Sequence, residues 1–322
     1  MKEEKVLKLK SVYKDYIWGG TKIRDILRKD TGDMERIAES WEVSTHADGQ
    51  SAIAEGEFAG KSLCEYFDLI GWNKLGEYGN KYHNLPILVK YIDAKENLSI
   101  QVHPDDEYSR ANENDSGKNE MWTVLDAEDN AFIYLGFNKD TNREEVERHI
   151  KNNTLEKLLN KIYVKKGETY YIPAGTVHAI GKGCLICEIQ QTSNITYRLY
   201  DYGRKDKSGN SRELHLKKAL EILNYQAFNI SEFMSADLEI MDKYLKSMLT
   251  DYGCCSIVNY EATDGALYDK EPSKIKFAIV YYGKGKIFCE NEQKEISCGD
   301  AFLLNGQAVK ITGKCNVILI NL

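Results

Sequence analysis

The sequence has little proline and no long apolar run. Four of its 322 residues are proline, and no stretch approaches the roughly 18 consecutive apolar residues that a membrane-spanning helix needs. The first residues, MKEEKVLKLK, lack the apolar core of a signal peptide. The net charge of -7 argues against general affinity for nucleic acid, because binding a polyanion needs a surface rich in lysine and arginine. We therefore predict a cytoplasmic protein that binds neither membranes nor nucleic acid.

The cysteines do not have the spacing of a disulfide framework or a zinc finger. There are eight in a long chain, and Cys184 and Cys187 have CxxC spacing without a second such pair. These two cysteines lie in the apolar run CLIC. We interpret the cysteines as reduced structural thiols, which behave as small buried hydrophobic residues.

The composition favours a β-rich protein with a sizeable core. Hydrophobic residues make up 42% of the chain and there are 21 tyrosines, and aromatic and β-branched residues suit pleated sheets. Short helices are predicted by spacing and caps at 21–29, at 60–70, after a cap at Thr141 or Asn142, near Thr154 and at 215–225. Strands are predicted at 86–94, 98–103, 121–126 and 131–136, and after about residue 230 we expect short strands joined by glycine turns.

The C-terminal part of the chain resembles an earlier segment. Aligning VKKGETYYIPAGTVHAIGKGCLICEI with ISCGDAFLLNGQAVKITGKCNVILI matches Gly167 with Gly299 and Glu168 with Asp300, but the later copy lacks the histidine. An internal repeat of this kind indicates two β domains of common origin. We expect a catalytic domain at 1–230, with helical insertions, and a degenerate copy at 231–322.

The segment LSIQVHPDD, residues 98–106, places polar side chains at alternate positions of a predicted strand. Successive strand residues face opposite sides, so Ser99, Gln101 and His103 share one face and Leu98, Ile100 and Val102 share the other. Taken alone, the polar row also fits a solvent-facing strand. Downstream, Lys118 and Glu120 in GKNEMWTVL are again two residues apart and share a face if the segment is extended.

The segment GETYYIPAGTVHAI, residues 167–180, fits the pattern G-x5-P-x-G-x2-H. This pattern resembles the second motif of the cupin family, whose members are small jelly-roll β-barrels. We therefore predict a mainly β fold with two cupin-like jelly-roll barrels and short helical insertions. Gln101, His103, Glu120 and His178 together supply two imidazoles, a carboxylate and an amide oxygen, which is a plausible zinc shell.

Several further segments, in order, resemble the type I mannose-6-phosphate isomerases in their shorter bacterial form. They are YIWGG, AESWEVS, LPILVKYIDAKENLSIQVHPDD, GKNEMW, PAGTVHAI and TYRLYDYGR, and the resemblance runs from about residue 10 to 205. It implies that Gln101, His103, Glu120 and His178 hold one metal ion per chain and that Arg198 is catalytic. Two histidines and a carboxylate also describe the iron site of many oxygenases. Zinc is favoured because it cannot oxidise an electron-rich enediol.

A phosphate site is predicted from lysines near these ligands. Lys90 lies in the otherwise apolar LPILVKYIDA, where a buried ammonium needs an anion; a snorkelling lysine or a pair with Asp93 would also fit. Ser99 and Lys118 would complete an anion pocket that resembles the substrate-binding arrangement of the family. The expected ligand is a sugar phosphate.

The resemblance implies interconversion of mannose 6-phosphate and fructose 6-phosphate through an enediol. Arg198 would stabilise oxygen charge, Lys118 would assist it, and we prefer Glu188 as the base, with a metal-bound water as the alternative. Many family members carry a tyrosine two residues after the metal histidine, where this chain has Ile180. A non-catalytic sugar-phosphate-binding cupin and an iron-dependent cupin oxygenase are the competing hypotheses. We expect a monomer or a homodimer.

Overall fold

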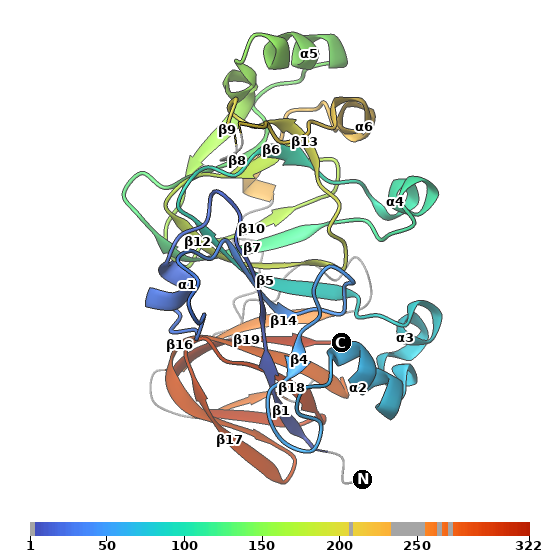
Figure 1. The fold of residues 1–322 in the computed structure, drawn as a ribbon, viewed down its shortest axis with the longest axis vertical. Coiled ribbons are helices and arrows are strands. Elements are labelled where there is room, and N and C mark those ends of the chain that lie inside the picture. Colours follow the sequence, from blue (N-terminus) through green and yellow to red (C-terminus); the bar gives the residue numbers. More distant parts are fainter. Residues whose placement is uncertain (1–3, 206–208, 233–254, 263–265, 270–272) are drawn as a thin grey trace.

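The structure is a computed structural model that describes residues 4–205, 209–232, 255–262, 266–269 and 273–322. Antiparallel strands dominate it and form three sheets that follow one another along the long axis of the molecule (Figure 1). The prediction of a mainly β fold is confirmed. Among the described residues, no helix is long and apolar enough to cross a membrane.

Each sheet has a distinct strand order. The five-stranded sheet contains, in spatial order, β13 (Tyr197–Tyr200), β6 (Ile100–Val102), β11 (His178–Ile180), β8 (Phe132–Phe137) and β9 (Leu159–Tyr163). The six-stranded sheet contains β10 (Thr169–Ile172), β7 (Glu120–Ala127), β12 (Cys184–Gln191), β5 (Ile87–Ala94), β3 (Glu39–Val43) and β2 (Val12–Lys14). The eight-stranded sheet contains β14 (Ser256–Ala262), β19 (Val309–Asn321), β16 (Ile275–Cys289), β18 (Ala301–Asn305), β1 (Val6–Lys10) and β4 (Ala52–Ile53), with β15 (Ala266–Asp269) beside β19 and β17 (Glu292–Ser297) beside β16.

The helices are short and lie outside the sheets (Figure 1). The α-helices are α1 (Lys22–Asp25), α2 (Leu63–Ile70), α3 (Gly76–Tyr82), α4 (Asp106–Asn112), α5 (Arg143–Lys151) and α6 (Leu216–Ile222), and the 3-10 helices are η1 (Trp72–Leu75), η2 (Leu155–Leu158) and η3 (Ile230–Glu232). Of the two predicted caps, Thr141 and Asn142, it is Asn142 that accepts a hydrogen bond from the Glu145 amide, an interaction typically worth about 1 kcal/mol. The helix expected at 21–29 is shorter than predicted.

The central strands of the six-stranded sheet are buried on both faces, so polar side chains on these strands lie inside the protein. All eight residues of β5 and all eight of β12 are buried. Odd positions of both strands, such as Tyr91 and Ile189, pack in a hydrophobic cluster shared with the eight-stranded sheet. Even positions such as Ile92 and Ile186 pack toward the five-stranded sheet. The polar side chains at Lys90 and Glu188 occupy even positions, so they lie between the five- and six-stranded sheets.

The C-terminal strands are longer than the sequence pattern predicted. β16 spans 15 residues and β19 spans 13, where short strands joined by glycine turns were expected. Gly283 and Gly313 lie inside these strands, not in turns. A Cβ at Gly283 would collide with the Lys314 carbonyl, and one at Gly313 with the backbone of Gly285. The glycines therefore permit close approach of two strands, a second role that sequence cannot distinguish from a turn.

The two segments aligned as a repeat form the same turn. Gly167 and Gly299 have φ angles of 92° and 91°, in the left-handed region that favours glycine. In each turn the next residue, Glu168 or Asp300, accepts a hydrogen bond from the backbone amide three positions earlier, at 2.8 and 2.9 Å. β1, however, pairs with β18 and β4, so the first strand is hydrogen-bonded within the C-terminal sheet. The division at residue 230 stays a prediction.

Candidate active site

The predicted polar row of β6 faces the interior between the five- and six-stranded sheets. Ile100 and Val102 pack on the outer side of the five-stranded sheet, while Gln101 and His103 approach the other predicted ligands from the inner side. The solvent-facing alternative is wrong, because His103 is 1% exposed. Leu98 was expected with Ile100, but it precedes the strand and lines the internal cavity.

Two histidines and a glutamate form a compact buried group. One ligand atom from each of His103, Glu120 and His178 lies within 4.8 Å of the others. The Nδ1 atoms of His103 and His178 each lie 2.8 Å from a backbone carbonyl, of Ile195 and Thr176. These contacts fix the tautomer in which Nδ1–H donates and Nε2 keeps its lone pair. Burial lowers the pKa of both imidazoles, that of His103 to about 3, so both are neutral and able to bind a metal.

Glu120 is an ionised carboxylate that lacks well-placed hydrogen-bond donors among its described neighbours. Burial alone would raise the pKa of its carboxyl, but the charge of the Lys118 ammonium holds that pKa well below its usual range. Lys118 Nζ lies 2.9 Å from Glu120 Oε1. Among the described residues, neither oxygen accepts a hydrogen bond of good geometry. A buried, ionised and under-bonded carboxylate facing two imidazole lone pairs fits a divalent cation.

Gln101 completes the predicted ligand set. It pairs with His178 on β11 and with Arg198 on β13, so it lies between them in the sheet. Its amide nitrogen lies 3.5 Å from the Nε2 atoms of both His103 and His178. Rotation of this amide by half a turn would present its oxygen at the same place, since amide nitrogen and oxygen are nearly equivalent in shape. The structure thus brings all four predicted ligands together.

A cavity of about 350 Å³ adjoins this group. Gln101 and Lys118 line it and also contact the buried group, so they connect the two. The other predicted site residues that line the cavity are Lys90, Ser99, Glu188 and Arg198. Ile180 lines it as well, and no phenol can act from that position.

Lys90 is buried among carboxylates. Its ammonium lies 3.6 Å from Glu188 Oε1 and 3.8 Å from Glu39 Oε2. Burial alone would lower the pKa of Lys90, but these carboxylates raise it above its ordinary value, so the lysine is charged. The alternative pairing with Asp93 is wrong, because Asp93 lies on the opposite face of β5 and accepts a hydrogen bond from the Lys22 amide.

Glu188 is held in an environment that favours its protonated form. Burial, together with the charge of Glu120, raises the pKa of its carboxyl to about 7, although Lys90 and Lys118 act in the opposite direction. The Trp122 indole donates a hydrogen bond of 2.8 Å to Glu188 Oε2. A carboxyl with a pKa near neutrality is able to take up and release a proton under ordinary conditions.

Arg198 is fixed at the wall of the cavity by three contacts. Its Nε donates to Ser99 Oγ at 3.1 Å and its Nη1 donates to the Glu213 carbonyl at 2.8 Å. Its backbone amide donates to His215 Nδ1 at 3.2 Å. This contact gives His215 a structural role at the wall of the cavity.

Comparison with known proteins identifies the family. The family model described as phosphomannose isomerase type I, catalytic domain, matches residues 6–130. The Bacillus subtilis protein named probable mannose-6-phosphate isomerase GmuF is 34% identical over 324 residues, which cover 97% of each chain. The chain belongs to the type I phosphomannose isomerase family.

Other members of the phosphomannose isomerase family agree with this assignment. Bacillus subtilis mannose-6-phosphate isomerase ManA is 35% identical over 92% of this chain and 91% of its own. The crystal structure of the mannose 6-phosphate isomerase from Bacillus subtilis has a TM-score of 0.86 and 31% identity, covering 99% of this chain and 100% of that one. A putative mannosephosphate isomerase from Archaeoglobus fulgidus, at 20% identity and a TM-score of 0.79, shows the fold alone.

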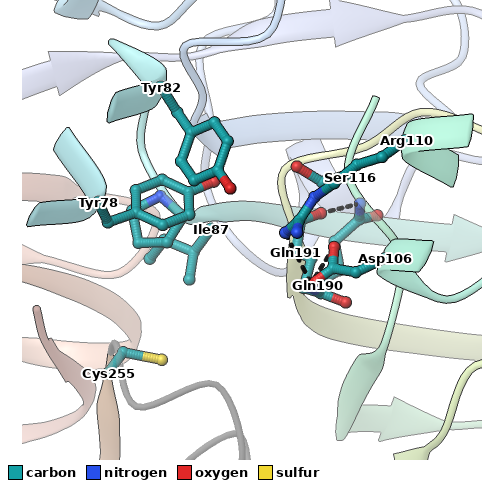
Figure 2. A pocket seen from close by; sticks show the side chains of 10 residues that line it. Tyr78, Tyr82, Ile87, Asp106, Arg110, Ser116, Gln190, Gln191 and Cys255 are labelled. Atoms are coloured by element: carbon teal, nitrogen blue, oxygen red, sulfur yellow. Dashed lines mark hydrogen bonds and ion pairs between the residues drawn. The ribbon is translucent and has the colours of Figure 1, made fainter. Parts of the chain in front are cut away.

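A second, smaller pocket of about 200 Å³ lies elsewhere in this phosphomannose isomerase chain. Figure 2 shows Tyr78 and Tyr82 of α3 on one side, and Asp106 and Arg110 of α4 on the other. Arg110 pairs with Asp106 at 3.2 Å. None of the described residues that line this pocket belongs to the metal-ligand group or to the first cavity. The predicted catalytic and substrate-binding residues therefore lie at the first cavity and not at this second pocket.

Sequence reasoning missed two charged residues of the first cavity, Glu39 and Arg212. Glu39 accepts a hydrogen bond of 2.7 Å from the Trp41 indole and lies beside Lys90. Alternation in AESWEVS places Glu39 and Trp41 on one face of a strand, and this pattern could have identified Glu39 as a candidate site residue. Arg212 lies in a polar loop whose spacing gives no such signal.

Proposed function

We propose that this chain interconverts mannose 6-phosphate and fructose 6-phosphate by proton transfer through an enediol. One observation carries the proposal: in a chain of the phosphomannose isomerase family, the buried group of His103, Glu120 and His178 adjoins a cavity lined by Arg198 and Glu188. The reaction needs both a means to stabilise charge on substrate oxygens and a group that moves a proton between neighbouring carbons. This cavity contains candidates for both.

We infer that one zinc ion per chain is held by Gln101, His103, Glu120 and His178. The donor set supports it, since two neutral imidazoles, a carboxylate and an amide oxygen suit a divalent cation. When bound, zinc would polarise the substrate oxygens as a Lewis acid without changing oxidation state. Iron bound by the same residues would tend to oxidise an enediol.

The cavity side chains support distinct roles in this reaction. Arg198, held in place by Ser99 and the Glu213 carbonyl, would stabilise the developing oxyanion with a permanent charge. Lys118, beside Glu120, would assist that stabilisation. Glu188 is our candidate base: the Trp122 indole holds its Oε2, which leaves Oε1 to accept the proton from the carbon beside the carbonyl.

Ser99, Lys90 and Lys118 are proposed to bind substrate, because all three line the cavity. Lys90 and Lys118 already face carboxylates at 2.9 to 3.8 Å. Their positive charge is therefore partly compensated before any substrate arrives. We therefore do not retain the prediction that these residues bind the phosphate, and propose instead that they contact sugar hydroxyl and carbonyl oxygens near the metal ligands.

The test is a coupled assay of fructose 6-phosphate formation from mannose 6-phosphate. We expect turnover by the purified protein, loss of at least about a hundredfold after chelation, and recovery when zinc is returned, because metal-assisted charge stabilisation contributes several kcal/mol. Metal analysis and an oxygen-uptake assay accompany it. Absence of turnover in the zinc-loaded protein would contradict the proposal, and oxygen uptake with bound iron would favour an oxygenase.

The pH profile tests Glu188. A base acts only when ionised, so with a pKa of about 7 we expect kcat/KM to fall as the pH drops below about 7, approaching tenfold per unit. Glu188→Gln should lose most of the activity and this acidic limb. Glu147→Gln, on the exposed surface of α5, is the matched control. An unchanged acidic limb in Glu188→Gln would exclude Glu188 as the base.

A further inference from the structure

Two arginines in the 201–212 segment share one buried carboxylate. Asp201 is 6% exposed, and it receives a hydrogen bond of 2.8 Å from Arg212 Nε. The Nη2 atoms of both Arg212 and Arg204 also contact Asp201 Oδ1. A guanidinium held by such a two-pronged pair is ordered before a ligand binds, so less conformational freedom is lost on binding.

The two arginines differ in what remains available to a ligand. Arg204 uses its Nη1 to donate to the Asn97 carbonyl, and its guanidinium lies over the Tyr202 ring. Arg212 lines the 350 Å³ cavity and its side chain is 26% exposed. Within the described ranges, Arg212 Nη1 has no hydrogen-bond partner. Arg212 therefore retains a donor for a molecule in the cavity, whereas the guanidinium of Arg204 contacts other groups of the protein.

Charge is unevenly distributed around this cavity. Near the metal-ligand group, the ammonium groups of Lys90 and Lys118 face three carboxylates, from Glu39, Glu120 and Glu188. Around Arg198 the balance is reversed. Arg212 and Arg204 are its charged neighbours, the buried carboxylate there is Asp201, and the Glu213 side chain is 83% exposed to solvent.

A substrate with a dianionic phosphate at one end and neutral hydroxyls at the other fits this distribution in one orientation. The phosphate would lie on the arginine side, since guanidinium groups bind phosphate oxygens with paired hydrogen bonds. The reacting carbons would then lie toward Gln101 and Lys118, and because Arg198 pairs with Gln101 across β13 and β6, Arg198 would still reach the oxygens of these carbons. The opposite orientation would place the reacting carbons away from Glu188 and from the proposed metal ligands.

We propose that Arg212, positioned by Asp201, binds the phosphate group of the substrate beside Arg198 and thereby selects phosphorylated over unphosphorylated sugars. This proposal rests on the proposed function and deepens it, because it assigns recognition of the phosphate to a residue outside the reacting centre. Arg212 is a binding residue. Its loss should weaken substrate binding more than it slows the chemical step.

The experiment compares Arg212→Gln with Arg204→Ala, which removes the other guanidinium on Asp201. For Arg212→Gln we expect KM for mannose 6-phosphate to rise about tenfold or more, as for other lost charge-assisted hydrogen bonds, with kcat within about threefold of the parent. Turnover of unphosphorylated mannose should be unchanged, and inhibition by inorganic phosphate should weaken in parallel. Arg212→Lys, which keeps the charge but loses the fork, should have an intermediate KM.

Calorimetric binding of mannose 6-phosphate to the metal-depleted protein separates this proposal from the proposed function, since it needs no turnover. Weaker binding by Arg212→Gln supports the role of Arg212 even if the parent protein fails to isomerise the sugar. Unchanged KM and unchanged binding in Arg212→Gln would overturn the proposal while leaving an active isomerase intact. An equal rise in KM for Arg204→Ala would also overturn it, because loss of the loop structure would then explain both variants.

Discussion

Replacement of His178 by alanine is expected to remove bound metal and isomerase activity together. The substitution deletes an imidazole whose Nε2 faces Glu120 Oε2 at 3.6 Å and leaves the other candidate ligands in place. Loss of one of few protein ligands weakens a metal site steeply, and a reaction that depends on the metal loses several kcal/mol of transition-state stabilisation. We expect activity to fall by at least about a thousandfold. Metal content per chain and the coupled assay are measured on the same samples.

The matched control for this variant is His149→Ala. His149 lies on α5, where its ring contacts Thr154, and its loss should leave metal content and activity near those of the parent. A His178→Ala protein that folds, retains full metal content and remains active would contradict the assignment of His178 as a ligand. His178→Gln, which preserves most of the side-chain volume, distinguishes loss of a ligand from a packing defect.

Replacement of Arg198 by alanine is expected to have the second-largest effect, and of a different kind. Arg198 lines the cavity and donates to Ser99 and to the Glu213 carbonyl, but it is not among the candidate ligands. Metal content should therefore stay at the parent level. Removing a preorganised donor to a developing oxyanion typically costs about a hundred- to a thousandfold in kcat. Single-turnover and steady-state kinetics with mannose 6-phosphate measure this loss.

Two further variants show whether the loss in Arg198→Ala comes from the missing charge, the missing guanidinium geometry or the substitution of any arginine. Arg198→Lys keeps a positive charge without the planar fork, and we expect it to recover only part of the lost kcat. Arg148→Ala, at an exposed arginine of α5, should behave as the parent. Unchanged kcat in Arg198→Ala would remove this residue from the mechanism, and loss of metal in the same variant would indicate a structural role.

The predictions that succeeded from sequence rest on short-range patterns. Alternation placed Gln101 of β6 and His103, which directly follows β6, on one side, and the glycine and proline positions around His178 indicated a strand turn. The same rule failed at Leu98, because alternation ends where the strand ends. The glycine pattern was also ambiguous, because it does not distinguish a glycine inside a long strand, such as Gly283 in β16, from a glycine in a turn.

The sequence by itself determined the β-rich character of the chain, its short capped helices and the candidate metal ligands, because a strand period of two and a motif spacing are properties of neighbouring residues. Only the tertiary structure decided which carboxylates neutralise Lys90, that β1 joins the C-terminal sheet, and that Asp201 orients Arg212 at the cavity. These contacts join positions that no local pattern relates. They depend on the packing of the three sheets, which decides which oppositely charged side chains lie next to each other in the interior.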